Sequence, residues 1–221
     1  DKGSYWEGMN VIGKSSTNTR LNLTLNTDNA FTGNMIVTTK GYSASDKREE
    51  FDTMSKEQYL EKIETESPYL EIEGYKRVNK DDVNKPLQEK FEVAFFDDSQ
   101  QYQYQRISPF FDERIRENPF KLKERKYPVD FGVPISYSYL LNLKIPEGYE
   151  IVSIPEDASI TLPNKGGVFM LKAQKKENEV KVFMRYVLNK KTYSGDEYQS
   201  LKQFFNQIIK TQKSYIEVKP N

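Results

Sequence analysis

Cysteine and histidine are both missing from this chain of 221 residues. Without cysteine the chain has no disulfide and no thiol nucleophile, and without histidine it has no imidazole base and no ordinary zinc site. An excess charge of either sign is missing too, because 33 basic residues balance 33 acidic ones. That balance argues against nucleic acid as a partner. No apolar run approaches the ~20 residues that a bilayer requires, so we expect no membrane span.

Motifs for catalysis and for cofactors are equally scarce. Adjacent acids occur at Asp81-Asp82 and Asp97-Asp98, but general acid–base catalysis needs two carboxyls that converge from different parts of a fold. We therefore interpret these pairs as solvated loop charges. The chain also has no glycine-rich phosphate loop. The sequence predicts no catalytic residue, no cofactor, no metal ligand and no enzyme activity in this chain.

Apolar and polar residues alternate in many parts of the chain. The longest alternating run extends from Ile135 to Ile145. A strand points successive side chains to opposite faces, so this stretch predicts a strand with one apolar and one wet face. Shorter alternating runs occur before and after it at hairpin spacing. The predicted fold class is mainly β (α+β), with antiparallel β-sandwich type subdomains and two amphipathic helices packed on the sheets.

Capping boxes mark the starts of the two helices. Ser55 pairs with Gln58, and Ser194 pairs with Glu197, each at the spacing that satisfies backbone donors at a helix start. The second helix carries a broad apolar stripe, which favours a structural lid over a partner-binding helix. The stripe consists of Tyr198, Leu201, Phe204, Phe205, Ile208 and Ile209.

Two subdomains follow from this pattern, with a boundary near residue 105. The N-terminal β subdomain, residues 1–105, contains one helix at 55–66. The C-terminal β-sandwich subdomain, residues 106–221, ends with the helix at 194–210. Within the second subdomain, residues 118–134, just before the strand at 135–145, are too rich in proline for a helix or a central strand, so we expect an ordered crossing segment there.

An aromatic and cationic stretch near the boundary is the one candidate binding surface. Aromatic faces and planar polar groups recognise both sugars and peptides. The alternative interpretation is a strand that leads to a rim, with Phe110 and Phe111 in the core. The candidate residues are Tyr102, Tyr104, Arg106, Arg114 and Arg116.

Three short motifs also carry a resemblance to a known family. PVDFG at 128–132, PEGY at 146–149 and SIPE at 153–156 resemble the C-terminal accessory domain of bacterial transglutaminase-like proteins. That domain is β-rich and of unknown function. The first half is similar more loosely, through Gly33, residues 41–44 and Arg48, and the end of the chain adds Tyr198, Leu201, Phe204 and Phe205.

The resemblance implies a non-catalytic accessory or interaction domain that supports a catalytic core of the same parent chain. It also implies a periplasmic, cell-surface or extracellular parent. A transglutaminase-like core needs cysteine and histidine, which this chain lacks. The alternative is a stand-alone β-sandwich module that binds a carbohydrate or a peptide. A hydrolase is disfavoured by the missing histidine and cysteine.

Overall fold

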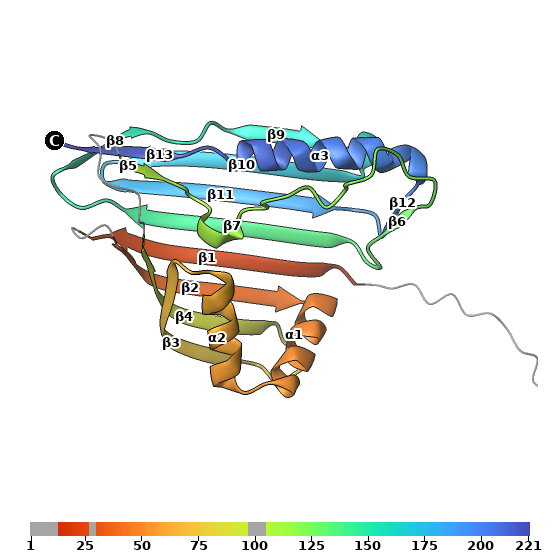
Figure 1. Ribbon diagram of the computed structural model, residues 1–221, viewed down its shortest axis with the longest axis horizontal. Helices are drawn as coiled ribbons and strands as arrows, with labels where there is room; N and C mark the ends of the chain where they lie inside the picture. The colour runs from red at the N-terminus through yellow and green to blue at the C-terminus, as the bar shows by residue number, and fades with distance from the viewer. Residues whose placement is uncertain (1–12, 27–29, 97–104) are drawn as a thin grey trace, which may run out of the picture.

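A single eight-stranded sheet dominates the computed structural model, which describes residues 13–26, 30–96 and 105–221 (Figure 1). Its strands are β1 (Ser15–Leu25), β2 (Ala30–Lys40), β3 (Leu70–Val78), β4 (Leu87–Phe96), β7 (Ile135–Lys144), β9 (Ala158–Thr161), β10 (Gly167–Lys176) and β11 (Glu179–Leu188). The strand order is β3-β4-β2-β1-β7-β11-β10-β9. The first four strands of the chain therefore form one half of the sheet, and the later four form the other half.

The two halves meet at β1 and β7, which run parallel from the pair Ser15 and Ile135 to the pair Thr24 and Lys144. The mainly-β (α+β) class is confirmed, but the large sheet is mixed and not antiparallel as predicted. Alternation identifies the face of a strand and not its neighbour, and a parallel pair requires a long connection. The division near residue 105 stays a prediction, and one sheet joins strands from both sides of it.

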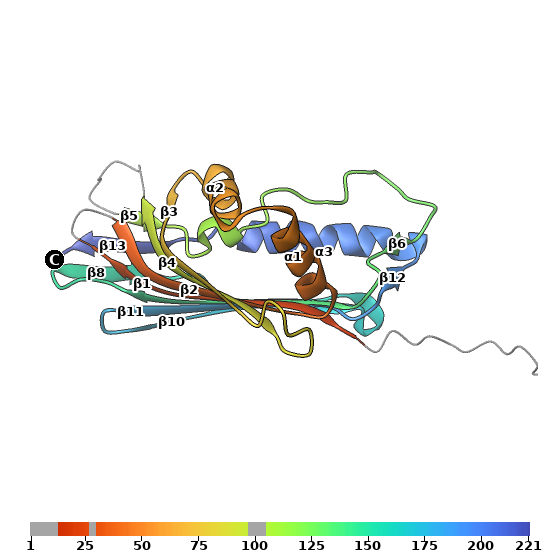
Figure 2. The same cartoon turned by 90° about the horizontal axis from the view of Figure 1, so that it is seen from below.

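Three helices and a small second sheet cover one face of the large sheet, and Figure 2 shows the helices on that side only. The helices are α1 (Tyr42–Thr53), α2 (Lys56–Glu66) and α3 (Tyr198–Thr211). The small sheet has the order β5-β13-β8, from β5 (Gln105–Ile107), β13 (Ile216–Pro220) and β8 (Tyr149–Ser153). The remaining elements are the pair β6 (Val129–Asp130) and β12 (Thr192–Tyr193), and the 3-10 turns η1 (Phe111–Glu113), η2 (Pro163–Lys165) and η3 (Gly195–Glu197).

Both predicted helices are present with their predicted capping boxes, and α1 was not predicted. Ser55 and Gln58 cap α2, while Ser194 and Glu197 form the box in η3, which leads into α3. Helix α1 buries only Ala44 and Phe51, so it has no apolar stripe that a periodicity argument would detect. The prediction of two helices was wrong for this reason.

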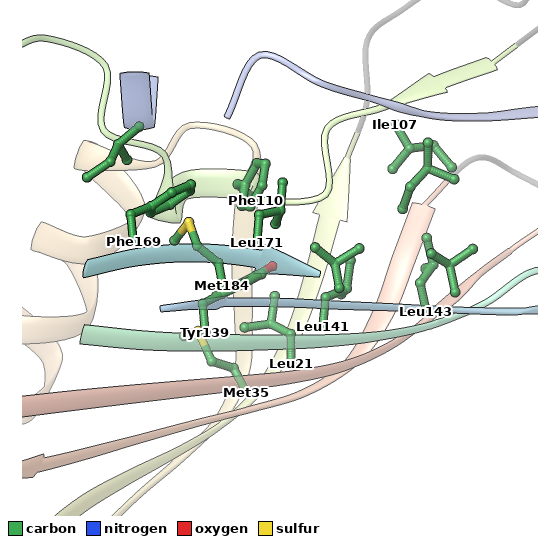
Figure 3. Close-up of a cluster of buried hydrophobic side chains, with 14 of the residues drawn as sticks. Leu21, Met35, Ile107, Phe110, Tyr139, Leu141, Leu143, Phe169, Leu171 and Met184 are labelled. Atoms are coloured by element: carbon green, nitrogen blue, oxygen red, sulfur yellow. The ribbon is translucent and has the colours of Figure 1, made fainter. Parts of the chain in front are cut away.

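The covered face of the large sheet forms a continuous apolar core (Figure 3). Tyr139, Leu141 and Leu143 of β7 are fully buried there, as the alternation predicts. They lie between Leu21 of β1 and Met184 of β11, so the core crosses the junction of the two halves. The predicted lid is also confirmed, because α3 buries Tyr198, Leu201, Phe204, Phe205 and Ile208.

Two glycines that carry the family resemblance occupy positions that need glycine. A Cβ atom on Gly33 would lie 2.0 Å from the backbone oxygen of Asn22 in the paired strand. Gly41 has φ of +67° at the start of α1, where a Cβ would meet the Lys14 oxygen at 2.9 Å. Both glycines therefore allow close backbone contacts in the first half of the sheet that a larger residue would block.

Candidate functional site

The predicted binding surface is only partly within the described residues. Tyr102 and Tyr104 lie outside them. Arg106 lies on β5, where its Nε donates to Glu217 Oε1 of β13 at 2.8 Å and its guanidinium lies 5.6 Å from the ring centre of Tyr215. Arg106 is thus engaged in holding the small sheet together.

Arg114 and Arg116 follow η1 in the crossing segment. Arg114 is half-buried and Arg116 is exposed. The alternative interpretation of this stretch is correct for its two phenylalanines, since Phe110 is fully buried and Phe111 contacts Phe31 with ring centres 5.4 Å apart. A sugar- or peptide-binding role for the arginines stays a prediction.

A carboxylate at the end of η1, just before the crossing segment, attaches this part of the chain to the sheet. Glu113 accepts a hydrogen bond from the Tyr137 hydroxyl of β7, and its other oxygen accepts from Thr19 Oγ1 of β1 at 3.2 Å. Burial, and then the charge of Glu113, raise the pKa of the Tyr137 hydroxyl well above its ordinary value. The tyrosine therefore stays a proton donor to the carboxylate. Glu113 bridges the two central strands, and hence the two halves of the sheet.

Buried polar groups hold the same segment to the sheet and to α3. Gln212, at the end of α3, is fully buried; its Oε1 accepts from the Ile115 backbone N–H at 2.9 Å, and its Nε2 lies 3.1 Å from Met184 Sδ. The Tyr139 hydroxyl donates to the Pro109 oxygen at 2.8 Å. Each bond satisfies a group that would be costly to bury alone. These bonds hold residues 109–115, just before the crossing segment, in which Asn118 Nδ2 donates to the Lys202 oxygen of α3 at 2.8 Å.

A second carboxylate lies in the first half, beneath α1 and α2. Glu89 of β4 is only 2% exposed, and its Oε1 accepts from the Tyr59 hydroxyl at 2.6 Å and from the Tyr75 hydroxyl at 2.8 Å. Lys47 Nζ of α1 donates to the Tyr59 oxygen, and Arg77 Nε of β3 donates to the Tyr75 oxygen, both at 2.8 Å. The two phenols thus relay hydrogen bonds from two cations to one buried carboxylate.

The electrostatics of this Glu89 cluster match that arrangement. Burial, and then the charge of Glu89, raise the pKa of the Tyr59 and Tyr75 hydroxyls well above the ordinary value. The Arg77 guanidinium lies 3.8 Å from the ring centre of Phe51 in α1, a favourable cation–π distance. Four elements, α1, α2, β3 and β4, therefore meet at one charge-compensated point.

Both carboxylates are engaged by side chains of the protein itself. Glu89 is buried and bonded to two tyrosines, and Glu113 is bonded to a tyrosine and a threonine. Glu89 lies beneath α1 and α2, whereas Glu113 lies at the junction of β1 and β7, so the two carboxyls belong to separate clusters. What these clusters do chemically is anchor covering elements on the sheet.

Sequence reasoning missed both glutamates, and only one gave a signal. Glu89 falls at an inward position of β4, in phase with Leu87, Phe91 and Val93, so a lone acid in an apolar series marked it. Glu113 lies in a short turn among other polar residues, where no periodicity applies. Among the described residues no group of three acidic side chains is placed to hold a metal ion. No helix in those ranges is long and apolar enough to cross a membrane.

A groove lies between α3 and the edge strand β9. It has a volume of about 390 Å³ and continues into a second hollow of about 260 Å³. Apolar side chains, among them Leu162 and Phe204, line it together with the amides of Gln203 and Gln207 and the hydroxyl of Ser200. Amides beside an apolar floor suit a peptide or a sugar.

Together the fold and these clusters define a β-rich (α+β) domain, in which helices and a small sheet cover one face of a large mixed sheet through polar and apolar contacts. A family model described as "Domain of Unknown Function with solved-structure structure" (DUF3858) matches residues 101–218, and the chain belongs to that family. The match contains the crossing segment, α3 and the whole second half of the sheet. No curated protein and no solved structure matched the chain.

Proposed function

We propose that this chain is a non-catalytic accessory domain that supports or positions a catalytic core of the same parent protein. The observation that carries the proposal is the use of the interior polar groups. Glu89, Glu113 and Gln212 each bond to groups that hold a covering element on the sheet. An interior built in this way serves rigidity, and a rigid scaffold suits the positioning of a neighbouring domain.

The family resemblance supports the same proposal and adds the kind of core. The motifs at 128–132, 146–149 and 153–156 resemble the accessory domain of transglutaminase-like proteins. We therefore propose a transglutaminase-like, periplasmic or cell-surface parent. The core would bring the cysteine and histidine that this chain lacks.

Two measurements test the proposal. The purified chain is assayed for hydrolysis of peptides and glycosides and for acyl transfer, and we expect no turnover. Activity that survives purification and disappears in Glu113→Gln, while Glu71→Gln keeps it, would refute a non-catalytic role. The full parent is then compared with a parent from which residues 13–221 are deleted. We expect the deletion to lower the Tm and turnover of the core, and an unchanged core would refute the supporting role.

A peptide-binding module is the second candidate, and the groove beside β9 favours it. Strand β9 is an end strand of the large sheet, so one of its edges is unpaired within that sheet. The other end strand, β3, is engaged differently, because the Ile72 N–H donates to Glu64 Oε1 of α2 at 2.8 Å. An extended peptide that pairs with β9 would gain backbone hydrogen bonds there.

The test of this second candidate is NMR titration with a set of extended peptides and with short oligosaccharides. Binding in the groove should perturb the amide signals of Gln203 and Gln207 and should weaken in Gln203→Lys. Gln174→Lys, on an exposed position of β10, is the matched control. Equal weakening in both variants would contradict the groove as the binding site.

A further inference from the structure

The uncovered face of the large sheet carries a row of cationic and apolar side chains that the proposed function does not use. Cross-strand partners define the row, which runs through seven strands from β3 to β10 and which we call the basic row. Its members, in order, are Lys76, Lys90, Ile36, Arg20, Leu140, Phe183 and Lys172. Their sequence neighbours Leu21, Leu141, Leu171 and Met184 lie buried on the covered face. The basic row therefore faces the side that Figure 2 shows without helices.

The charge of this face differs from the charge of the whole chain. The four cations of the basic row are exposed, and among the described residues none of them forms an ion pair. The same face adds Lys40, Lys144, Lys176, Lys181 and Arg185, against Glu71, Glu92 and Glu179. Among the described residues that the strand register places on this face, nine cations thus compare with three carboxylates, although the chain as a whole is neutral. The net charge conceals a segregation of charge between the faces.

One pair in the basic row works against the stability of the sheet. Lys76 and Lys90 are direct cross-strand partners, and like charges directly opposite each other destabilise a sheet. No acidic side chain lies in the row to offset them. Glu92 lies two residues along β4 on the same face, outside the row, and a docked acidic surface would offset the repulsion further.

Three apolar side chains, Ile36, Leu140 and Phe183, lie on either side of Arg20 in the middle of the basic row, and we call them the apolar centre. Ile36, Leu140 and Phe183 are half-buried, so each leaves part of an apolar side chain open to a partner. In the flanking row, Asn142 Nδ2 donates to Asn22 Oδ1 at 2.7 Å, and Asn22 Nδ2 donates to Asn34 Oδ1 at 2.8 Å. The hydrogen-bonded amides hold a flat polar strip beside the apolar centre.

The dimensions of the face fit a protein partner. Seven strands at ~4.8 Å spacing span about 29 Å, and the eight residue steps from Ser16 to Thr24 span about 27 Å at ~3.4 Å each. The product is close to the ~800 Å² that each partner contributes to a standard interface. Apolar side chains inside a polar rim are also the usual composition of such an interface.

We propose that the basic row and the face around it dock an acidic surface of a folded protein domain. This inference rests on the proposed function, because it names the surface through which a non-catalytic domain would act. Opposite charge gives the partner its orientation and speeds association, while Ile36, Leu140 and Phe183 supply the contact that excludes water. A nucleic-acid or polysaccharide chain would use the cations but would have no use for the three apolar side chains.

Binding of model polymers tests the proposal without knowledge of the partner. The probes are fluorescent poly-L-glutamate and a random glutamate–tyrosine copolymer, with double-stranded DNA and alginate as competing polyanions. We expect the copolymer to bind the full chain more tightly than the other three and to weaken with added salt. Tighter binding of DNA or alginate would overturn the choice of a protein partner. Absence of binding to any probe at low salt would overturn the surface itself.

Matched variants locate the binding. Arg20→Glu, Lys90→Glu and Lys172→Glu together should lower copolymer affinity by at least about tenfold, the loss of a few charge-assisted contacts. The control reverses Lys123, Lys126 and Lys210, three exposed lysines of the crossing segment and α3, for the same change in net charge. Equal losses in both variants would overturn the basic row as the site. If the first variant does not fold, as judged by circular dichroism, the three glutamine substitutions replace it.

A variant of the apolar centre distinguishes docking through charge and apolar contact from binding by charge alone. Phe183→Ser should remove the preference for the copolymer over poly-L-glutamate and leave poly-L-glutamate binding unchanged. A preference that persists would overturn the interface geometry. None of these assays measures turnover, so catalytic activity in the chain would refute the proposed function and leave the binding results to be judged on their own.

Discussion

The two halves of the sheet are covered in different ways. In the first half, α1 and α2 together bury only Ala44, Phe51 and Tyr59, and they meet the sheet around the hydrogen bonds of Glu89. In the second half, α3 alone buries five large side chains and seals the sheet by apolar contact. Apolar burial gives free energy without direction, whereas a satisfied buried polar cluster fixes one arrangement. We infer that the Glu89 hydrogen bonds fix the arrangement of α1 and α2 on the first half. Buried apolar surface holds α3 on the second half.

The stretch from η1 through the crossing segment is held by both apolar packing and hydrogen bonds. Phe120 packs its ring against Phe205 at 5.2 Å and Tyr198 at 5.8 Å, measured between ring centres. Glu113, in contrast, bonds to the two central strands through Tyr137 and Thr19. The segment therefore joins the apolar cover of the second half to the junction of the halves.

The largest expected effect is on the apolar cover. Phe204→Ala should lower the free energy of unfolding by about 3–5 kcal/mol, because the ring is 2% exposed and its removal leaves a cavity. Urea unfolding monitored by circular dichroism measures the change. Gln207→Ala, on the exposed side of α3, is the control. Equal stability of the two variants would mean that α3 does not seal the second half.

The stability of the first half, where α1 and α2 meet the sheet around Glu89, should depend on the charge of Glu89 and not on its volume. Glu89→Gln keeps the shape of the side chain but removes the charge that two tyrosine hydroxyls and two cations are arranged to meet. We expect a loss of about 1.5–3 kcal/mol, the usual value of hydrogen bonds to a charged group. Glu71→Gln on exposed β3 is the matched control. If both substitutions cost the same in urea unfolding, the first cover does not depend on the Glu89 charge.

The sequence predicted the parts of the fold that repeat and missed those that depend on tertiary partners. Alternation located β7 and its inward residues Tyr139 and Leu141, and the capping boxes located α2 and α3. Helix α1 escaped because it buries only Ala44 and Phe51, too few apolar positions to form a stripe. The parallel pairing of β1 with β7 escaped because the partner of a strand depends on the whole chain and not on its own pattern.

The polar clusters were harder to predict than the elements that carry them. Tyr59, Tyr75 and Glu89 come from three elements, and no local pattern brings them together. The basic row has the same property, since Lys90 and Arg20 lie in one line only once the register of the strands is known. Zero net charge concealed the row because the balancing acids lie mostly elsewhere.

Alkaline pH should weaken the protein through its buried tyrosines. Burial, and then the charge of Glu113, raise the pKa of Tyr186 to about 12. An unfolded tyrosine titrates near ~10, so above that pH the unfolded chain loses a proton that the folded chain keeps. The contribution of Tyr186 to the free energy of unfolding is therefore complete below pH ~10. It declines by about 1.4 kcal/mol per pH unit as pH rises toward 12.

Tyr186→Phe tests this, because its stability should fall less steeply than that of the wild type between pH ~10 and ~12. Denaturant unfolding at several alkaline pH values gives the slopes. Tyr127→Phe, whose ring is 79% exposed, is the matched control for the loss of one hydroxyl. A wild-type slope in Tyr186→Phe would contradict the raised pKa.

The smallest effect should be at the junction of the halves. Tyr137→Phe removes one of the donors to Glu113. Because Glu113 is half-buried, water can replace the lost hydroxyl, and we expect a loss of only about 0.5–1.5 kcal/mol. The double variant with Thr19→Val, measured as a mutant cycle in urea, should show coupling between the two donors, since both bond to the same carboxylate. Additive losses would mean that Glu113 does not link β1 to β7, and that the backbone ladder, the shared core and the Asn142–Asn22 bond join the two halves without it.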